Sequence, residues 1–82
     1  MNNEKIWNRI AIDPEIMVGK PVIKGTRIPV ELIVRMVAQG ISEADILAEY
    51  PRLDLADIRA ALSYAAIVVA QEDVFPLLPL AA

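Results

Sequence analysis

The chain contains no cysteine and no histidine, and only 5% of its 82 residues are aromatic. Without cysteine it can form neither a disulfide framework nor a thiolate metal site. Without histidine it lacks the commonest metal ligand and the commonest general base. Two close carboxylate pairs, Asp13 with Glu15 and Asp54 with Asp57, are explained by helix capping. We therefore expect no catalytic residue, no metal, no cofactor and no enzymatic activity.

Long apolar runs are also lacking. The longest, residues 60–70, is interrupted by Ser63 and is too short to cross a bilayer. Near the start, Glu4 and Lys5 occupy positions where a signal peptide would begin its apolar region. We expect a cytoplasmic protein with no membrane association.

Apolar residues are in excess, at 56%, and the charges are unevenly distributed. In a chain long enough for only one small domain, such an excess indicates apolar surface kept for a partner. The formal net charge of -3 averages two unlike parts, because residues 5–35 carry a balance of +3 and residues 42–73 a balance of -5. Contacts to a polyanion must therefore come mainly from the N-terminal part.

The first third of the sequence is typical of strands and tight turns. Ile6, Ile10 and Ile12 would share one face of a strand, since alternate residues point the same way. Residues 13–19 predict a single helical turn that begins at an Asp-Pro pair and is closed by a glycine. Residues 22–28 predict a short hairpin, in which 22–23 and 27–28 flank a turn at Lys24-Gly25-Thr26.

Three helices are predicted after the hairpin. The first begins at Pro29 and ends at Gly40, with an apolar stripe of Val30, Ile33, Val34 and Val37. The second begins after Ser42 and ends at Glu49, before Tyr50-Pro51. The third runs from a cap at Asp54 to Glu72 with heptad-like apolar positions at Leu55, Ile58, Leu62, Ala65 and Val69. Its second half is apolar on all sides, so we expect another surface to cover it.

The C-terminal segment, residues 74–82, contains no charged residue and two prolines. The prolines forbid a stable helix and favour an extended chain. We treat residues 1–73 as one domain and 74–82 as an apolar tail, which either folds back on the domain or binds a partner. The candidate partner-binding residues are Val74, Phe75, Leu77, Leu78 and Leu80.

The second and third helices have the spacing of a helix-turn-helix, although many three-helix cores share it without binding DNA. Asp54 and Asp57 begin the third helix, and their charge disfavours its insertion among phosphates. The candidate DNA contacts are the basic residues Lys20, Lys24 and Arg27, with Arg52 and Arg59 secondary. The alternative for all five is a solvated rim with no ligand.

The runs Gly19-Lys-Pro-Val-Ile-Lys-Gly-Thr-Arg-Ile-Pro-Val30 and Gly40-Ile-Ser-Glu-Ala-Asp-Ile-Leu-Ala-Glu-Tyr-Pro51 carry a resemblance to a known family. With residues 10–16 and 57–62, they resemble domain-of-unknown-function family 433 (DUF433). The resemblance covers roughly residues 6–72 and implies a mainly α fold: a helix-turn-helix core of homeodomain-like or winged type, with short N-terminal strands. Gly19, Pro21, Gly25, Thr26, Arg27 and Pro29 would form the family's signature loop.

The same resemblance implies a bacterial antitoxin of a type II toxin–antitoxin pair, encoded beside a PIN-like ribonuclease toxin. The expected protein is then a homodimer that binds its own promoter DNA weakly and holds the toxin with residues 74–82. A structural dimerisation or adaptor module without nucleic-acid binding is the alternative, and the charge balance of -5 in residues 42–73 favours it. DNA binding separates the two.

Overall fold

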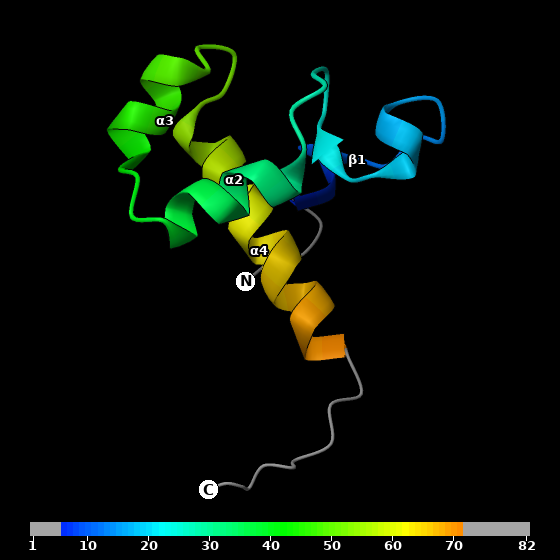
Figure 1. Ribbon diagram of the computed structural model, residues 1–82. Helices are drawn as coiled ribbons and strands as arrows, with labels where there is room; N and C mark the ends of the chain where they lie inside the picture. The colour runs from blue at the N-terminus through cyan, green and yellow to red at the C-terminus, as the bar shows by residue number, and fades with distance from the viewer. Residues whose placement is uncertain (1–5, 72–82) are drawn as a thin grey trace, which may run out of the picture.

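The computed structural model describes residues 6–71, which form three α-helices and a short two-stranded antiparallel sheet (Figure 1). The elements in chain order are β1 (Ile10–Ala11), the 3₁₀ helix η1 (Met17–Gly19), β2 (Val22–Ile23), α2 (Val30–Ala38), α3 (Glu43–Glu49) and α4 (Leu55–Gln71). The prediction of a mainly helical chain is confirmed. The five apolar tail residues predicted to bind a partner lie outside the described residues. Over residues 6–71, no helix has the length and composition needed to cross a bilayer.

The first strand is shorter than the sequence predicts. Residues 6 and 7 are helical, and the Arg9 backbone N–H donates to the Ile6 carbonyl at 2.9 Å. The pairing of β1 with β2 covers only two residues of each strand, with Ile10 opposite Ile23. Ile6 and Ile10 are buried, whereas Ile12 is 52% exposed, so the prediction of one shared face is wrong for Ile12. The reason is that the chain leaves the ladder before Ile12 to enter the following turn.

Residues 13–19 form two consecutive tight turns in place of one capped helical turn. Asp13 does act as a local acceptor, because its Oδ1 takes the Glu15 backbone N–H at 2.9 Å. The chain then enters η1 with left-handed backbone at three successive residues: Met17 at φ 52°, Val18 at φ 57° and Gly19 at φ 80°. Glycine adopts this region freely, but a β-branched residue such as valine rarely does. Val18 is therefore strained, and its side chain is 93% exposed.

The predicted hairpin is present in a short form, because the Ile23 N–H donates to the Ile28 carbonyl at 3.0 Å and a bridge joins Val22 and Pro29. The Thr26 N–H donates to the Ile23 carbonyl at 3.0 Å, and Gly25 takes a φ of 81°. Residues 27–28 do not form a strand, since β2 pairs with β1 and makes only an isolated bridge between Val22 and Pro29 on its other side. The Thr26 hydroxyl takes the Ile28 N–H at 3.0 Å, which uses a donor that a longer ladder would need.

The three helices begin and end close to the predicted residues. Pro29 precedes α2, which ends shortly before Gly40, at φ 85°. Ser42 caps α3, its hydroxyl taking the Asp45 N–H at 3.1 Å, and α3 ends before Tyr50. The capping residues, prolines and glycines in the sequence were therefore sufficient to predict where these helices begin and end.

The core brings together one fully buried isoleucine from each helix, Ile33, Ile46 and Ile58, and Val22 from β2. In the predicted stripe of α2, the first two positions are buried and the last two are half-buried. Met36 is buried although the stripe did not include it. The buried face of α2 is therefore turned slightly from the predicted one.

The second half of α4 lies beyond the core. Figure 1 shows its last turns, in orange, extending away from α2 and α3. Ala66, Val68, Val69 and Ala70 are exposed, with Val69 at 63%. Within residues 6–71, the apolar surface that the sequence predicted would be covered is therefore exposed.

Replacing Val18 with glycine should stabilise the fold. The substitution removes a side chain that is 93% exposed and relieves left-handed backbone strain. We expect a free energy of unfolding higher by about 1 kcal/mol, measured by urea denaturation. Val18→Ala is the control, because alanine keeps the side-chain penalty at positive φ and should change stability much less. A Val18→Gly chain no more stable than Val18→Ala would contradict the strain.

Candidate nucleic-acid interface

Two arginines from distant parts of the sequence line one surface hollow. Arg27 follows the turn after β2, and Arg52 lies in the turn between α3 and α4. The hollow, of about 400 Å³, is completed by Ala11, Ile16, Val22, Gly25 and Thr26. Guanidinium groups bind phosphate oxygens through paired N–H donors. The hollow can therefore accept a phosphate or another small anion.

Arg52 is held at this position by its own turn and by the loop that it contacts. Its Nη2 donates to the Gly25 carbonyl at 2.9 Å. Its neighbour Leu53 is buried and donates its N–H to the Tyr50 carbonyl at 2.9 Å, which places Arg52 at the tip of the turn. The hydrogen bond to Gly25 thus joins the α3–α4 turn to the loop that carries Arg27.

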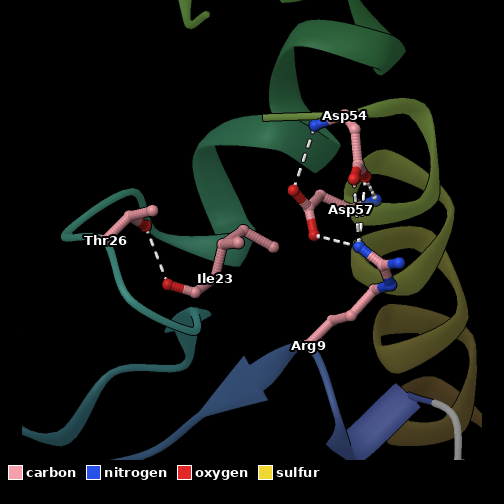
Figure 2. Close-up of polar contacts among 5 residues, drawn as sticks. All are labelled: Arg9, Ile23, Thr26, Asp54 and Asp57. Atoms are coloured by element: carbon pink, nitrogen blue, oxygen red, sulfur yellow. Dashed lines mark hydrogen bonds and ion pairs between the residues drawn. The ribbon is translucent and has the colours of Figure 1, made fainter. Parts of the chain in front are cut away.

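The residues of the predicted signature loop have structural roles in this arrangement. The Thr26 hydroxyl donates to the Ile23 carbonyl at 2.7 Å, as Figure 2 shows, and Gly25 has the positive φ that the turn requires. The Pro21 carbonyl accepts the Val30 N–H at 2.9 Å, and Gly19 has a φ of 80°. These residues therefore determine the shape of the loop on which Lys20, Lys24 and Arg27 lie.

The other predicted basic residues lie apart from the two arginines. Lys24 Nζ donates to the Trp7 carbonyl at 3.3 Å, and Lys24 lines a second hollow with Asn8, Arg9 and Asp57. Lys20 Nζ lies 3.7 Å from a Glu31 carboxylate oxygen on α2. Both lysines thus have local partners, and Lys20 is paired with an acid.

Arg59 is exposed on α4, seven residues after Arg52. Of the five predicted DNA contacts, the structure therefore brings only Arg27 and Arg52 into one hollow.

The acidic start of α4 is bound by Arg9, a basic residue that the sequence did not indicate as part of this site. Arg9 Nη1 donates to Asp54 Oδ1 at 3.1 Å and to Asp57 Oδ1 at 3.0 Å (Figure 2). The two aspartates also cap the helix reciprocally, since the Asp54 N–H donates to Asp57 Oδ2 and the Asp57 N–H to Asp54 Oδ1. The predicted capping role is confirmed, and Asp57 is buried. The sequence held no signal for Arg9, which lies 45 residues before Asp54.

These contacts shift the titration of the exposed members of the cluster. The pKa of Asp54 lies below its ordinary value, first because the Asp57 backbone N–H donates to it and then because the Arg9 charge lies beside it, with burial opposing. The pKa of Arg9 is raised above its ordinary value, mainly by its hydrogen bond to Asp57. The positive charge of Arg9 beside Asp54 and Asp57 reduces the repulsion that their carboxylates would exert on phosphates.

A metal site is not evident in the same region. Over residues 6–71, no three His, Cys, Asp or Glu side chains gather closely enough to hold an ion. The Asp54 and Asp57 carboxylates bind backbone N–H groups and Arg9 in the way that caps and ion pairs do.

Comparison with known proteins identifies relatives but no activity. The family model described as "Protein of unknown function (DUF433)" matches residues 10–65. A crystal structure of a DUF433 member protein from Anabaena variabilis superimposes with a TM-score of 0.73 at 35% identity, over 83% of this chain and 67% of that one.

Two curated relatives are both uncharacterised. The protein y4eO of Sinorhizobium fredii is 41% identical over 56 residues, and an Archaeoglobus fulgidus protein is 64% identical over 28 residues. The first match covers 68% of this chain but 25% of y4eO, so the chain spans about a quarter of that relative's length. The second covers 34% of this chain and 78% of its relative. The domain therefore also occurs within a longer protein.

Acid should weaken the fold through Asp54. Because its pKa is lower in the folded chain than in the unfolded one, its contribution is complete above the unfolded pKa of about 3.9 and is lost as pH falls through the folded value. Asp54→Asn keeps a good N-cap but removes the charge. We expect this variant to lose stability less steeply with acid in urea titrations.

Glu49→Gln is the matched control for this experiment, because Glu49 is exposed at the end of α3, away from the Arg9 cluster. It should keep the parent slope of stability against pH. Equal slopes for Asp54→Asn and the parent chain would contradict the assignment.

Proposed function

Because the chain belongs to the DUF433 family, we propose that it is an antitoxin-like homodimer that binds promoter DNA through Arg27 and Arg52 and holds a PIN-like ribonuclease toxin through residues 74–82. The observation that carries the DNA half is the shared hollow of the two arginines, fixed by the hydrogen bond from Arg52 to Gly25. The resemblance of the sequence to antitoxins of this family motivates the toxin half.

The arrangement of the last two helices supports the DNA half. In the proposed reading, α3, the turn at residues 50–54 and α4 form a helix-turn-helix of homeodomain-like or winged type. Arg52 then lies in the turn of that motif, and Arg59 is exposed on its second helix. Such positions suit contacts to the phosphate backbone, which give affinity and orientation without sequence reading.

Reading of bases by the first turn of α4 is not part of the proposal. The Asp54 side chain remains 64% exposed, and Arg9 offers one positive charge against two negative ones. A net negative charge at this helix start opposes insertion into the major groove. We therefore propose weak, salt-sensitive binding dominated by phosphate contacts.

The tail is assigned to the toxin on chemical grounds. Residues 74–82 contain five large apolar side chains and no charge, which fits an extended ligand for an apolar groove. The candidate contacts are Val74, Phe75, Leu77, Leu78 and Leu80.

A second candidate function is a dimeric adaptor that does not bind nucleic acid. The specific observation in its favour is the apolar surface of α4, where Val68 and Val69 are 39% and 63% exposed. Such a surface serves protein contacts in either function. DNA binding is therefore the property that separates the two proposals.

Neutralising the arginine pair should weaken DNA binding and its salt dependence together. We expect Arg27→Gln and Arg52→Gln each to lower affinity for a duplex from upstream of the coding region, measured by fluorescence anisotropy. The slope of log affinity against log salt should fall by about one for each phosphate that the variant no longer neutralises.

Arg27→Lys and Arg52→Lys are the controls, because each keeps the positive charge at its position. They should keep the slope and lower affinity much less. Failure of the parent chain to bind either the upstream duplex or an unrelated duplex at low salt would overturn the DNA half and favour the adaptor.

Removal of the tail should release the toxin. We expect a chain ending at Asp73 to lose co-purification with a PIN-like nuclease encoded beside it, because the apolar side chains of residues 74–82 are gone. A chain lacking only Ala81 and Ala82 is the control and should retain the nuclease. Equal recovery of the nuclease with both truncated chains would contradict this role.

A further inference from the structure

An apolar groove runs between α2 and α4 on a part of the surface distinct from the arginine hollow. Its volume is about 370 Å³, and its lining is almost wholly apolar. The α2 wall is built from Val30, Val34 and Ala38, and the α4 wall from Tyr64, Ala65, Val68 and Val69. We infer that this groove is the contact surface with a second copy of the same chain, which specifies how the homodimer of the proposed function is built.

The shape of the surface meets the requirement of a two-fold interface. In such an interface the same patch must supply both the projecting feature and the feature that receives it. Val68 and Val69 line the groove and lie in the second half of α4. The last turns of α4 extend away from α2 and α3 (Figure 1). The α4 of each copy can therefore pack in the groove of the other.

The positions along α4 continue an interface that already exists inside the chain. Ile58 is fully buried and Leu62 packs against the core, and Ala65 and Val69 follow them at the same heptad-like spacing. Among the described residues, the stripe thus continues beyond the part of α4 that the core covers. Alanines next to this stripe allow a second helix to approach closely.

The charges fit a second copy. No charged residue occurs in α4 between Arg59 and Glu72, so two such helices meet without repulsion. The α2 rim of the groove carries Glu31 and Arg35, one charge of each sign, paired with each other. When two such rims run antiparallel, Glu31 of each copy can lie opposite Arg35 of the other. A partner that carried charges of only one sign would be attracted to one of these residues and repelled by the other.

The apolar tail is a weaker occupant. An extended strand laid in the groove would cover the side that faces α2 and would leave Ala66 and Ala70 of α4 exposed. A second copy brings an α2 and an α4 together, and so covers more of the projecting helix.

The first experiment measures mass. Sedimentation velocity of the full chain should show a dimer at micromolar concentration, and Val69→Glu should raise its dissociation constant at least about 100-fold, since a buried unpaired carboxylate is costly. Val18→Glu is the matched control, because Val18 is an equally apolar, 93% exposed residue outside the groove, and it should remain dimeric. A monomeric parent chain, or equal effects of the two variants, would overturn the inference.

A second experiment identifies the occupant, using the absence of cysteine from the sequence. Val68→Cys with a short bismaleimide should give a cross-linked dimer, whereas Val18→Cys should not. In a full chain carrying Val68→Cys and Leu78→Cys, a cross-link within one chain at monomer mass would assign the groove to the tail and overturn the inference. Because these readouts are masses, a failure of DNA or toxin binding leaves them unaffected and is recognised separately.

Discussion

The contact of Arg9 with Asp54 and Asp57 is the interaction on which the rest of the arrangement depends. The reciprocal cap at the start of α4 places two carboxylates close together, and a cation nearby reduces their repulsion. Arg9 supplies it and in doing so ties the segment before β1 to the last helix. β1 in turn pairs with β2, and β2 leads into the turn that presents Arg27. The start of α4 is therefore connected, through Arg9 and the β1–β2 pairing, to a loop that is distant in sequence.

In the loop of residues 19–29, some residues determine the shape of the backbone and others carry the charges proposed to bind a ligand. Gly25 and Thr26 are explained by a left-handed backbone and a local hydrogen-bond network, and Pro29 by its position before α2. Such residues would be needed whether or not a ligand binds. The functional proposal consequently depends on Arg27 and Arg52, whose side chains line the hollow.

The sequence predicted the features that depend on neighbouring residues. The boundaries of α3 follow from Ser42 and Tyr50-Pro51, and these are contacts within one or two turns. It did not predict the end of β1 before Ile12, because strand length depends on a partner strand elsewhere in the chain. It ranked Lys20 above Arg52 as a DNA contact, because only the folded chain shows that Lys20 meets Glu31 and that Arg52 meets Gly25 beside Arg27. Contacts between residues far apart in the sequence determine both the length of β1 and the surroundings of the basic residues.

The hydrogen bond from Arg52 to Gly25 has a thermodynamic consequence for the proposed anion site. A guanidinium carries five N–H donors, and this bond uses one of them. An anion held by the others would also be held by a loop and a turn that come together only when the chain is folded. Because the anion would bind only the folded chain, tighter binding of the anion raises the free energy of unfolding. A domain of this size, with a modest core, would be most stable when its ligand is present.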